Sequence, residues 1–402
     1  MANRVELVVV GGGLSGLALA IACAGTGLAV ALVDREDPAR MLDQTFDGRT
    51  TALAYGSQQV LATLGLWDGL AAEAEAIREI RVADGGSHLF LHYDHRDLGD
   101  HPLGFIVENQ VLRRVLWQRA RELPSLALLA PCAVERVSYD VDGATAALSD
   151  GTSLKAALVA AADGRNSPLR TAAGIAVVTW SYPQTGIVCT VRHEEPHRGI
   201  AVEHFLPAGP FAILPMTGNR SSIVWTERAA LAPALMALDD QEFLAELASR
   251  FGDYLGALAL DGPRWSYPLS FLHATRYGAM RLALVGDAAH VIHPIAGQGL
   301  NLGIRDVAAL AELIVDARRL GLDIGLAVGE RYERWRRLDA IMLSAVTDGL
   351  NRLFSNTMPP LMLARDLGLA AVERLPPLKR LFMRHAMGIV GELPRLARGE
   401  PL

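Results

Sequence analysis

The stretch RLALVGDAAHVIHPIAGQGLNLGIRD, residues 281–306, indicates how the rest of the chain is organised. Residues 282–285 are apolar and predict a buried strand, and Asp287 places a carboxylate just after it. Gly297 and Gly299 punctuate the following loop, and apolar positions at helical spacing from Leu300 onward predict a helix. Glycines before a helix let backbone N–H groups approach a ligand, and the N-terminus of a helix favours negative charge. We therefore expect this strand–loop–helix unit to hold a large polar cofactor.

A second glycine-rich unit lies near the N-terminus. Residues 5–10 predict a strand, 17–25 a helix and 29–33 a second strand that ends at Asp34. The spacing Gly11-x-Gly13-x-x-Gly16 permits a tight turn and the close approach of a pyrophosphate, and Asp34 is placed to accept a hydrogen bond from a ribose hydroxyl. We expect a dinucleotide-binding βαβ unit here rather than a signal peptide, because the glycines interrupt the apolar run.

The composition limits the classes of protein that this chain can form. Its 402 residues are too many for one small core and predict two domains. Hydrophobic residues make up 51% and charged residues 20%, which indicates a globular, rather apolar protein. The formal net charge of −6 argues against a general nucleic-acid binder. Cys23, Cys132 and Cys189 lie far apart, so we expect no disulfide framework, no metal site and a cytoplasmic location.

The remaining segments predict a third strand that is followed by a carboxylate, and a separate β-sheet. Residues 157–174 predict a strand, then Asp163-Gly164-Arg165, then a helix that starts at Ser167-Pro168. Arg49 precedes a short amphipathic helix and is either a phosphate clamp or a surface arginine. Alternating residues predict a hairpin over 77–107, around Gly85-Gly86, small β-strands over 126–150 and short strands over 176–280. From residue 303 onward the pattern is almost entirely helical.

Three motifs now stand in order: GGGLSG with Asp34, ADGRNSP at 162–168, and residues 281–306. Together they resemble the FAD-dependent aromatic hydroxylases with the p-hydroxybenzoate hydroxylase fold, the class A flavoprotein monooxygenases. The form HPxxGQGLNLGxxD at 293–306, with RTTALAYGS at 49–57, is most similar to the ubiquinone-biosynthesis hydroxylases. The resemblance covers about residues 4–350.

The resemblance implies an α/β fold with three parts. A discontinuous Rossmann-like FAD-binding domain is expected from residues 1–75, 101–175 and 281–330. Residues 76–100 and 176–280 are expected to form an inserted, mostly antiparallel β-sheet domain that binds the substrate. Residues 331–402 are expected to form a C-terminal helical region.

The resemblance also implies a role for each motif residue. Gly11, Gly13 and Gly16 are expected at the FAD pyrophosphate, with Asp34 on the adenosine ribose. Asp287 is expected to accept from the ribitol chain, and Asp163 is associated with both FAD and the pyridine nucleotide. The remaining cofactor contacts are expected from Arg49 and Gln110, and those around the flavin ring from Pro294, Gly297, Gln298, Gly299, Leu300 and Asn301.

The implied chemistry belongs largely to the cofactor. Reduction by NAD(P)H, addition of O2 at flavin C4a to give the hydroperoxide, and transfer of one oxygen to an electron-rich ring are expected. A second glycine fingerprint is absent from the sequence, so NAD(P)H is expected to visit transiently. A glycine-rich donor loop would stabilise the negative charge near N1 of reduced flavin. His290 and His293 are expected to be hydrogen-bonded structural histidines rather than acid–base groups or metal ligands.

Fewer residues indicate which substrate binds and where. The resemblance implies a polyprenylated phenol, with a ring-facing pocket from the inserted sheet; our candidates are Phe211, Leu214, Pro215 and Trp225, each of which could equally be sheet core. The basic, apolar C-terminal segment could rest on the inner membrane face, pack against a ubiquinone-biosynthesis complex or another subunit, or pack on the protein's own core.

Several alternatives stay open at this point. Within the same fold these are a hydroxylase of another small aromatic, an epoxidase and a prenyl reductase. A halogenase is disfavoured because Lys155 and Lys379 are poorly placed. An NAD-dependent dehydrogenase would leave residues 281–306 without a role. A non-enzymatic scaffold is the last alternative, which substrate-dependent NAD(P)H oxidation would exclude.

Overall fold

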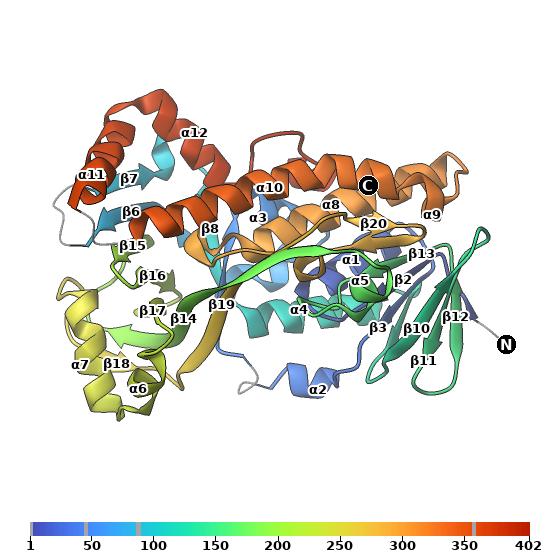
Figure 1. Ribbon diagram of the computed structural model, residues 1–402, viewed down its shortest axis with the longest axis horizontal. Helices are drawn as coiled ribbons and strands as arrows, with labels where there is room; N and C mark the ends of the chain where they lie inside the picture. The colour runs from blue at the N-terminus through green and yellow to red at the C-terminus, as the bar shows by residue number, and fades with distance from the viewer. Residues whose placement is uncertain (1–2, 44–46, 86–89, 356–358) are drawn as a thin grey trace.

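The computed structural model describes residues 3–43, 47–85, 90–355 and 359–402. Two large sheets organise the chain, and a row of helices from its C-terminal third runs along one side of both (Figure 1). The parallel sheet carries the glycine motifs, and the second, mostly antiparallel sheet lies beside it. The predicted α/β fold class is confirmed.

The parallel sheet brings the three motifs to one edge. Its strand order is β20-β21-β13-β2-β3-β9. The central strands are four-residue or shorter apolar runs with no exposed position, as expected where helices cover both faces. β21, β13 and β2 are parallel neighbours, and each is followed by one motif, so the three motifs meet at the carboxyl ends of adjacent strands. The strands span β2 Leu7–Val10, β3 Val30–Val33, β9 Leu126–Leu129, β13 Leu158–Ala161, β20 Gly278–Ala279 and β21 Leu282–Leu284.

Helix α1 (Leu14–Ala24) packs on this sheet and contacts two further helices. It is apolar almost all round and nearly fully buried, which fits a helix enclosed by a sheet and other helices. It contacts α4 (Asn109–Glu122) and α8 (Gln298–Arg319). The start of α8 therefore lies beside the glycine turn that precedes α1, although the two are far apart in sequence.

The second sheet is built around one long strand. β14 (Val177–His193) pairs with β17 and β18 at one end and with β19 along much of its length. β22 (His290–Val291) pairs with β19, so the 281–306 stretch contributes a strand to each large sheet and ties them together. The other strands are β6 Glu79–Asp84, β7 Phe90–Asp94, β15 Ile200–Leu206, β16 Gly209–Met216, β17 Arg220–Arg228, β18 Leu258–Leu260 and β19 Trp265–Ala274.

Opposite faces of this sheet have different partners. On one face, α6 (Ala232–Ala237) and α7 (Asp240–Phe251) cover an apolar core at the yellow end of the molecule in Figure 1. The other face contacts β4 (Thr50–Ala54), the 295–297 turn and the C-terminal helices. This second face is therefore the one that meets the glycine-rich loop.

Smaller elements complete the fold. β4 pairs with β8 (Gly104–Glu108) and β8 with β5 (Glu75–Ile77). A second small sheet has the order β1-β12-β11-β10, with β1 Asn3–Arg4, β10 Val134–Tyr139, β11 Ala144–Leu148 and β12 Ser153–Ala156. The remaining helices are α2 Pro38–Met41, α3 Tyr55–Thr63, α5 Pro168–Ala172, α9 Ile324–Ala327, α10 Gly329–Phe354, α11 Pro359–Arg374 and α12 Pro376–Ala386.

Several predicted boundaries need correction. The first helix begins at Leu14 rather than at residue 17, and the helix after the third motif begins at Gln298 rather than at Leu300. Residues 126–129, expected with the small β-strands, form β9 in the parallel sheet beside β3. The hairpin expected over 77–107 includes β6 and β7, and its predicted turn residue Gly86 lies outside the described residues.

Candidate functional site

The first glycine motif forms a turn that excludes larger residues. Gly11 has a φ of +108°, and a Cβ there would lie 2.2 Å from the carbonyl oxygen of Ala162. A Cβ on Gly16 would lie 1.9 Å from the oxygen of Gly11. A Cβ on Gly13, by contrast, would meet no atom within 4 Å. Gly11 and Gly16 are therefore required by the fold itself, whereas Gly13 keeps open the space before α1.

Asp34 ends β3 beside this turn. Its Oδ2 accepts a short hydrogen bond from the backbone N–H of Gly12, and its Oδ1 accepts one from Glu36 N at 2.7 Å. The residue is only 9% exposed. The carboxylate is thus fixed at the carboxyl end of a strand, next to the glycine turn, as the fingerprint predicted.

Arg49 belongs to a charged group at the start of β4. Its Nε and one terminal nitrogen each donate to Asp47 at 2.9 Å, and Arg113 donates to the same carboxylate at 3.0 and 3.1 Å. Desolvation is the largest influence on Asp47 and opposes its ionisation, but the hydrogen bonds and charge of Arg49 together with the charge of Arg113 lower the Asp47 pKa overall. The Arg49 side chain is still 52% exposed, so it keeps a surface for an anion. It also lies 5.1 Å from the ring centroid of Tyr267.

Asp163 follows β13 and is incompletely paired. Its Oδ2 accepts from Leu169 N at 3.3 Å, while its Oδ1 is buried and has no hydrogen-bond partner among the described residues. Desolvation raises the pKa of its carboxyl. A buried polar atom without a partner is costly, so Oδ1 is a ready acceptor for a ligand hydroxyl or N–H group.

Asp287 lies in the turn Gly286–Ala288, directly after β21. Gly286 has a φ of +60°, and a Cβ there would lie 3.0 Å from Ser15 Oγ, so this turn lies against the start of α1. The Asp287 side chain is exposed, yet protein surrounds it closely, and the resulting desolvation raises its pKa. His290, Arg49 and Arg165 oppose that rise through their charges. Arg49, although far away in sequence, therefore faces the same space as Asp287.

The glycine-rich loop leads into α8 without a side-chain cap. Gly297 is the N-cap residue and has a left-handed φ of +61°. A Cβ on Gly297 would lie 2.8 Å from Ala52 Cβ, whereas Gly299 has open space around it. The first N–H groups of a helix lack intrahelical acceptors, so the N-terminus of α8 presents donors and a positive dipole end.

Asn301 holds this loop against β4. Its Oδ1 accepts from Ala54 N at 2.8 Å, and its Nδ2 donates to Ala52 O at 2.7 Å and to Gly297 O at 3.1 Å. The residue is only 2% exposed. Asn301 therefore shapes the loop with its side chain, and any contact that it makes with a ligand would come from its backbone.

Other predicted cofactor residues surround the same region. Gln110 donates to Leu42 O at 3.1 Å. Pro294 precedes the turn Ile295–Gly297, and the partly buried Leu300 packs against the main core. Pro294, Gln298, Gly299 and Leu300 are all partly exposed, so this loop remains accessible along its length.

A buried network beneath the loop was missed by sequence reasoning. Asp306 is fully buried and accepts from His290 Nε2 at 2.5 Å, Arg336 Nε at 2.9 Å and Gly286 N at 3.2 Å. The motif HPxxGQGLNLGxxD ends in this aspartate, which was the only signal for its role. His290 is thus hydrogen-bonded, as predicted.

The matching prediction for His293 is wrong. This residue is fully buried, and neither ring nitrogen has a hydrogen-bond partner among the described residues. Its ring instead packs edge-on against Tyr182, with centroids 5.1 Å apart. Burial lowers its pKa to about 4, so the imidazole is neutral near pH 7.

The substrate candidates divide between the two faces of the second sheet. Phe211 and Trp225 are 0% and 1% exposed and belong to the core beneath α7, with Phe243 among their neighbours. Pro215 lies four residues after Phe211 on β16, so both side chains point to the same face of the sheet. Leu214 belongs instead to the cluster that includes Ala52. The expectation that Phe211, Pro215 and Trp225 face the flavin ring is therefore replaced, since these three form sheet core.

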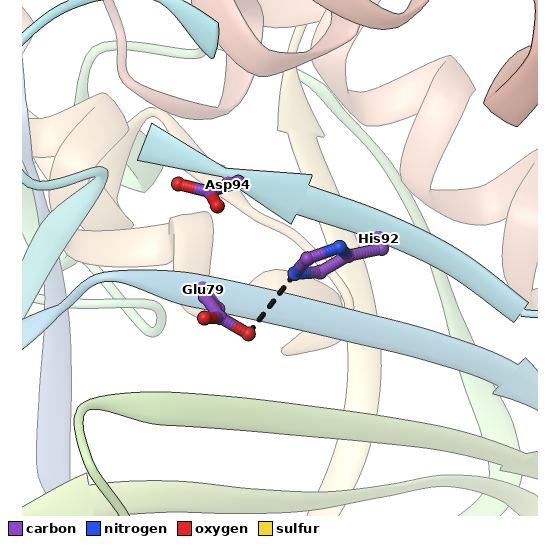
Figure 2. Close-up of side chains that lie close together, drawn as sticks. All are labelled: Glu79, His92 and Asp94. Carbon is purple, nitrogen blue, oxygen red and sulfur yellow. Dashed lines mark hydrogen bonds and ion pairs between the residues drawn. The ribbon is translucent and has the colours of Figure 1, made fainter. Parts of the chain in front are cut away.

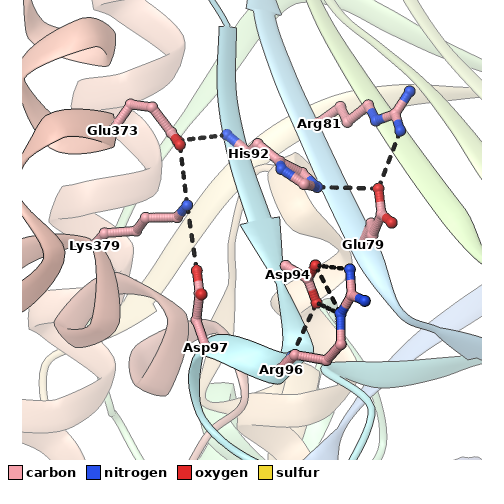
Figure 3. Close-up of polar contacts among 8 residues, drawn as sticks. All are labelled: Glu79, Arg81, His92, Asp94, Arg96, Asp97, Glu373 and Lys379. Carbon is pink, nitrogen blue, oxygen red and sulfur yellow. Dashed lines mark hydrogen bonds and ion pairs between the residues drawn. The ribbon is translucent and has the colours of Figure 1, made fainter.

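One group of metal-ligand residue types occurs in the described chain, at Glu79, His92 and Asp94 (Figure 2). His92 Nε2 lies 3.0 Å from Glu79, Arg81 pairs with Glu79 at 3.0 Å and Arg96 pairs with Asp94 at 2.5 Å. The Arg96 hydrogen bond lowers the pKa of Asp94 to about 2. Two arginines thus already neutralise both carboxylates (Figure 3), which disfavours a cation there. The absence of a metal site stays a prediction.

These features fit an extended dinucleotide cofactor. Gly13 leaves space before a helix N-terminus for a pyrophosphate, Asp34 and Asp163 supply acceptors, and α8 supplies donors at the other end. The fold and this site together define an FAD-binding flavoprotein with an attached β-sheet domain.

Comparison with known proteins narrows this class. A family profile described as an FAD binding domain matches residues 4–319. The chain is 55% identical to the ubiquinone hydroxylase UbiL of Rhodospirillum rubrum over 99% of this chain and 93% of that protein. It is 36% identical to the 3-demethoxyubiquinol 3-hydroxylase of Escherichia coli, over 96% and 98% of the two chains.

The fold is similar to that of p-nitrophenol 4-monooxygenase PnpA from Pseudomonas putida, with a TM-score of 0.80 at 21% identity, over 96% and 98% of the two chains. That likeness concerns the fold alone. The sequence matches carry the assignment: the chain belongs to the FAD-dependent hydroxylase family of ubiquinone biosynthesis. It is a flavin-dependent monooxygenase, and FAD is its cofactor.

Proposed function

We propose that this protein hydroxylates the aromatic ring of a polyprenylated phenol in ubiquinone biosynthesis, with NAD(P)H and O2 as co-substrates. The observation that carries the proposal is the meeting of the three motifs at the ends of β2, β13 and β21, combined with relatives named ubiquinone hydroxylases over nearly the whole chain. In sheets of this kind, ligands bind at the carboxyl ends of the strands.

Each group at this edge has a proposed part in holding the cofactor. Gly11, Gly13 and Gly16 would let the pyrophosphate approach α1, and Asp34 would accept from the adenosine ribose. The exposed guanidinium of Arg49 would face the cofactor phosphates, with Asp47 fixing its direction. Gln110 would lie at the edge of this phosphate region. Asp163 and Asp287 would accept from hydroxyls of the cofactor chain.

The loop before α8 would hold the flavin ring. Bound FAD supplies the transfer of two electrons from NAD(P)H and the activation of O2. The N-terminus of α8 would stabilise negative charge on the ring, and Pro294 with Gly297–Asn301 would border it. Gly297 has no side chain that could displace the ring. A larger residue would not fit at this position, because a Cβ on Gly297 would lie 2.8 Å from Ala52 Cβ.

The aromatic ring of the substrate would lie between this loop and the second sheet. The face of the sheet that meets the loop carries Leu214 and Ala201, together with Ala52 from β4. These side chains are apolar, which suits a phenol ring with a hydrocarbon tail.

Part of α12 would contact a membrane, the medium in which a polyprenyl substrate dissolves. None of the described helices combines the length and the apolar character that crossing a membrane needs. Leu375, Leu381 and Phe382 are 52%, 46% and 42% exposed, and the exposed Arg380 and Arg384 lie among them. Apolar side chains interleaved with arginines favour an anionic lipid surface.

The other side of this segment packs on the protein itself. Met383 is fully buried, and Lys379 pairs with Asp97 at 3.3 Å and with Glu373 at 3.1 Å (Figure 3). Glu373 also accepts from the backbone N–H of His92 at 2.9 Å. α12 is therefore held by Asp97 and by α11, and α11 is in turn bonded to the edge strand β7, which would leave the outer side of α12 free for lipid.

The decisive experiment is turnover by the purified, FAD-loaded protein. A phenol with a short prenyl tail should stimulate NAD(P)H oxidation and yield a product heavier by one oxygen atom. Protein that binds no FAD, or oxidises NAD(P)H without forming that product from any prenylated phenol, would refute the proposal. Flotation with phosphatidylglycerol vesicles tests the membrane contact, with Phe382→Ser expected to reduce it and Leu326→Ser on α9 as the control.

A further inference from the structure

We propose that Glu203 accepts the phenolic proton of the substrate while the ring is hydroxylated. This inference rests on the function proposed above and assigns a catalytic residue to it.

The position of Glu203 in β15 fixes the direction of its side chain. Glu203 pairs with Ala212 on β16 and with Val82 on β6, with a regular register on both sides. Val202 belongs to the core beneath α7, so the alternation of a strand directs Glu203 to the opposite face. This is the face that meets the glycine-rich loop.

The neighbours of Glu203 on that face connect it to the loop. Ala201 belongs to the apolar cluster that contains Ala52, against which Gly297 packs. Phe205 belongs to the cluster that contains Ile295, the first residue of the turn before α8. Glu203 lies between these two residues, so it sits on the wall opposite the predicted flavin loop.

The carboxyl of Glu203 has no hydrogen bond or ion pair with any described residue. Burial alone raises its pKa to about 7, yet the residue retains partial solvent access. Other ionisable groups face this region from adjacent elements. Asp84 on β6 is already paired with Arg365 of α11 at 2.8 Å, and the Tyr93 hydroxyl on β7 has a pKa raised by burial.

A purely structural role gives no reason to place a glutamate here. A carboxyl surrounded by Ala201, Phe205 and Leu214 has a desolvation cost that no partner in the described chain offsets. Groups with such raised pKa values gather where proton transfer is needed. A pKa near neutrality lets a carboxylate accept a proton and return it within one turnover.

The Glu203 carboxylate takes the proton of the phenol O–H, and the resulting phenolate donates electron density to the ring. One atom of O2 becomes the new ring hydroxyl, and the other leaves as water; the hydride of NAD(P)H supplies two electrons and one hydrogen, and solvent and the ring carbon supply one proton each. The ring carbon loses its hydrogen as a proton, and Glu203 returns its own proton to the original phenolate oxygen.

The test compares Glu203→Gln with His204→Gln in FAD-loaded protein. His204 is the adjacent residue and points to the other face of the strand, so it controls for any change in β15 itself. The substrates are a geranyl-substituted phenol and its O-methyl ether, which has no acidic proton. Flavin content and thermal midpoint are measured alongside kcat and KM from pH 5.5 to 9.5.

In the wild type, kcat for the phenol should rise with pH through about 7 as Glu203 ionises. Glu203→Gln should lose on the order of 100-fold in kcat and recover only as the pH approaches the phenol's own pKa of about 10. Its KM and flavin content should stay close to wild type, and His204→Gln should keep the wild-type profile. The methyl ether should be a poor substrate for all three proteins.

Two outcomes overturn the inference and differ from each other. If the wild type hydroxylates the phenol and Glu203→Gln keeps the same kcat and pH profile, Glu203 is not the proton acceptor and the proposed function stands. If the wild type hydroxylates no prenylated phenol, the proposed function and this inference both fail.

Discussion

His290 Nε2 lies 2.5 Å from Asp306 Oδ2, and both side chains are almost fully buried. The same Asp306 also pairs with Arg336 Nε at 2.9 Å and accepts from the backbone N–H of Gly286 at 3.2 Å. Asp306 therefore joins α8, α10 and the turn that carries Asp287. This network sets the distance between the predicted ribitol acceptor and the predicted flavin loop.

Replacing Asp306 should destabilise the fold strongly. Asp306→Ala leaves His290 without its partner and Arg336 with one fewer, so we expect a loss of about 3–5 kcal/mol in the free energy of unfolding. Asp316→Ala is the control, because Asp316 lies on the same helix in a pair with Arg395 but is 38% exposed. The control should lose no more than about 1 kcal/mol. Equal losses in urea unfolding would contradict a special role for the network.

Asp287 should control how tightly FAD is held. Asp287→Asn replaces a pure acceptor with an amide of the same shape, so the fold should persist while the protein loses most of its flavin on gel filtration. Asp150→Asn is the control, since Asp150 caps an exposed turn by accepting from Thr152 N at 2.9 Å. The ratio of flavin to protein absorbance measures both, and an unchanged ratio in Asp287→Asn would remove the assigned role.

Two glycines of one motif should respond differently to alanine. A Cβ on Gly16 would lie 1.9 Å from the oxygen of Gly11, so Gly16→Ala should yield little folded protein. A Cβ on Gly13 meets no protein atom, so Gly13→Ala should fold normally but bind FAD at least about 10-fold more weakly where the pyrophosphate approaches. Circular dichroism and flavin titration separate the two effects. Normal FAD affinity in Gly13→Ala would place the pyrophosphate elsewhere.

The sequence predicts the parallel sheet well because its signals are local. Each motif joins an apolar run, a glycine turn and a helix start, and such units have few alternative structures. The structure then shows that β2, β13 and β21 are parallel neighbours, which the local patterns do not specify. The role of Asp306 could not be predicted in the same way, because its partner Arg336 is 30 residues away on another helix.

The two faces of the second sheet could not be told apart from the sequence. β16 reads GPFAILPM, which is apolar on both faces, so alternation gives no signal for which face meets the flavin loop. For Phe211 and Trp225 the sequence left a substrate pocket and sheet core equally open. Their true environment depends on α7, which packs on them from residues 240–251.

Substitutions on the two faces should therefore separate stability from substrate binding. Trp225→Ala empties a core position beneath α7 and should cost about 3–5 kcal/mol in stability with little change in KM at a permissive temperature. Leu214→Ala, on the other face, should raise KM for the geranyl-substituted phenol several-fold while the thermal midpoint falls less. Steady-state kinetics and thermal unfolding with saturating FAD measure both. A larger KM effect for Trp225→Ala than for Leu214→Ala would indicate that the substrate pocket lies on the Trp225 face.

The Glu203 carboxyl should also change how the stability of the protein depends on pH. Its pKa rises from 4.5 in the reference state to about 7 in the fold, so the folded protein holds this proton more tightly. That contribution is present at low pH and is lost as pH rises through about 7, where the buried carboxylate becomes costly. Glu203→Gln stays neutral, so it should be more stable than wild type at pH 8, by on the order of 1–3 kcal/mol, and nearly equal to it at pH 5.

Glu246→Gln is the matched control for this effect. Glu246 lies on the surface of α7, 51% exposed and paired with Arg250, so its replacement should change stability by less than about 1 kcal/mol at either pH. Urea unfolding of all three proteins with saturating FAD at pH 5 and pH 8 makes the comparison. A Glu203→Gln protein that is less stable than wild type at pH 8 would mean that the carboxylate is favourably paired in the fold. The isolated, proton-accepting Glu203 that we propose would then be excluded.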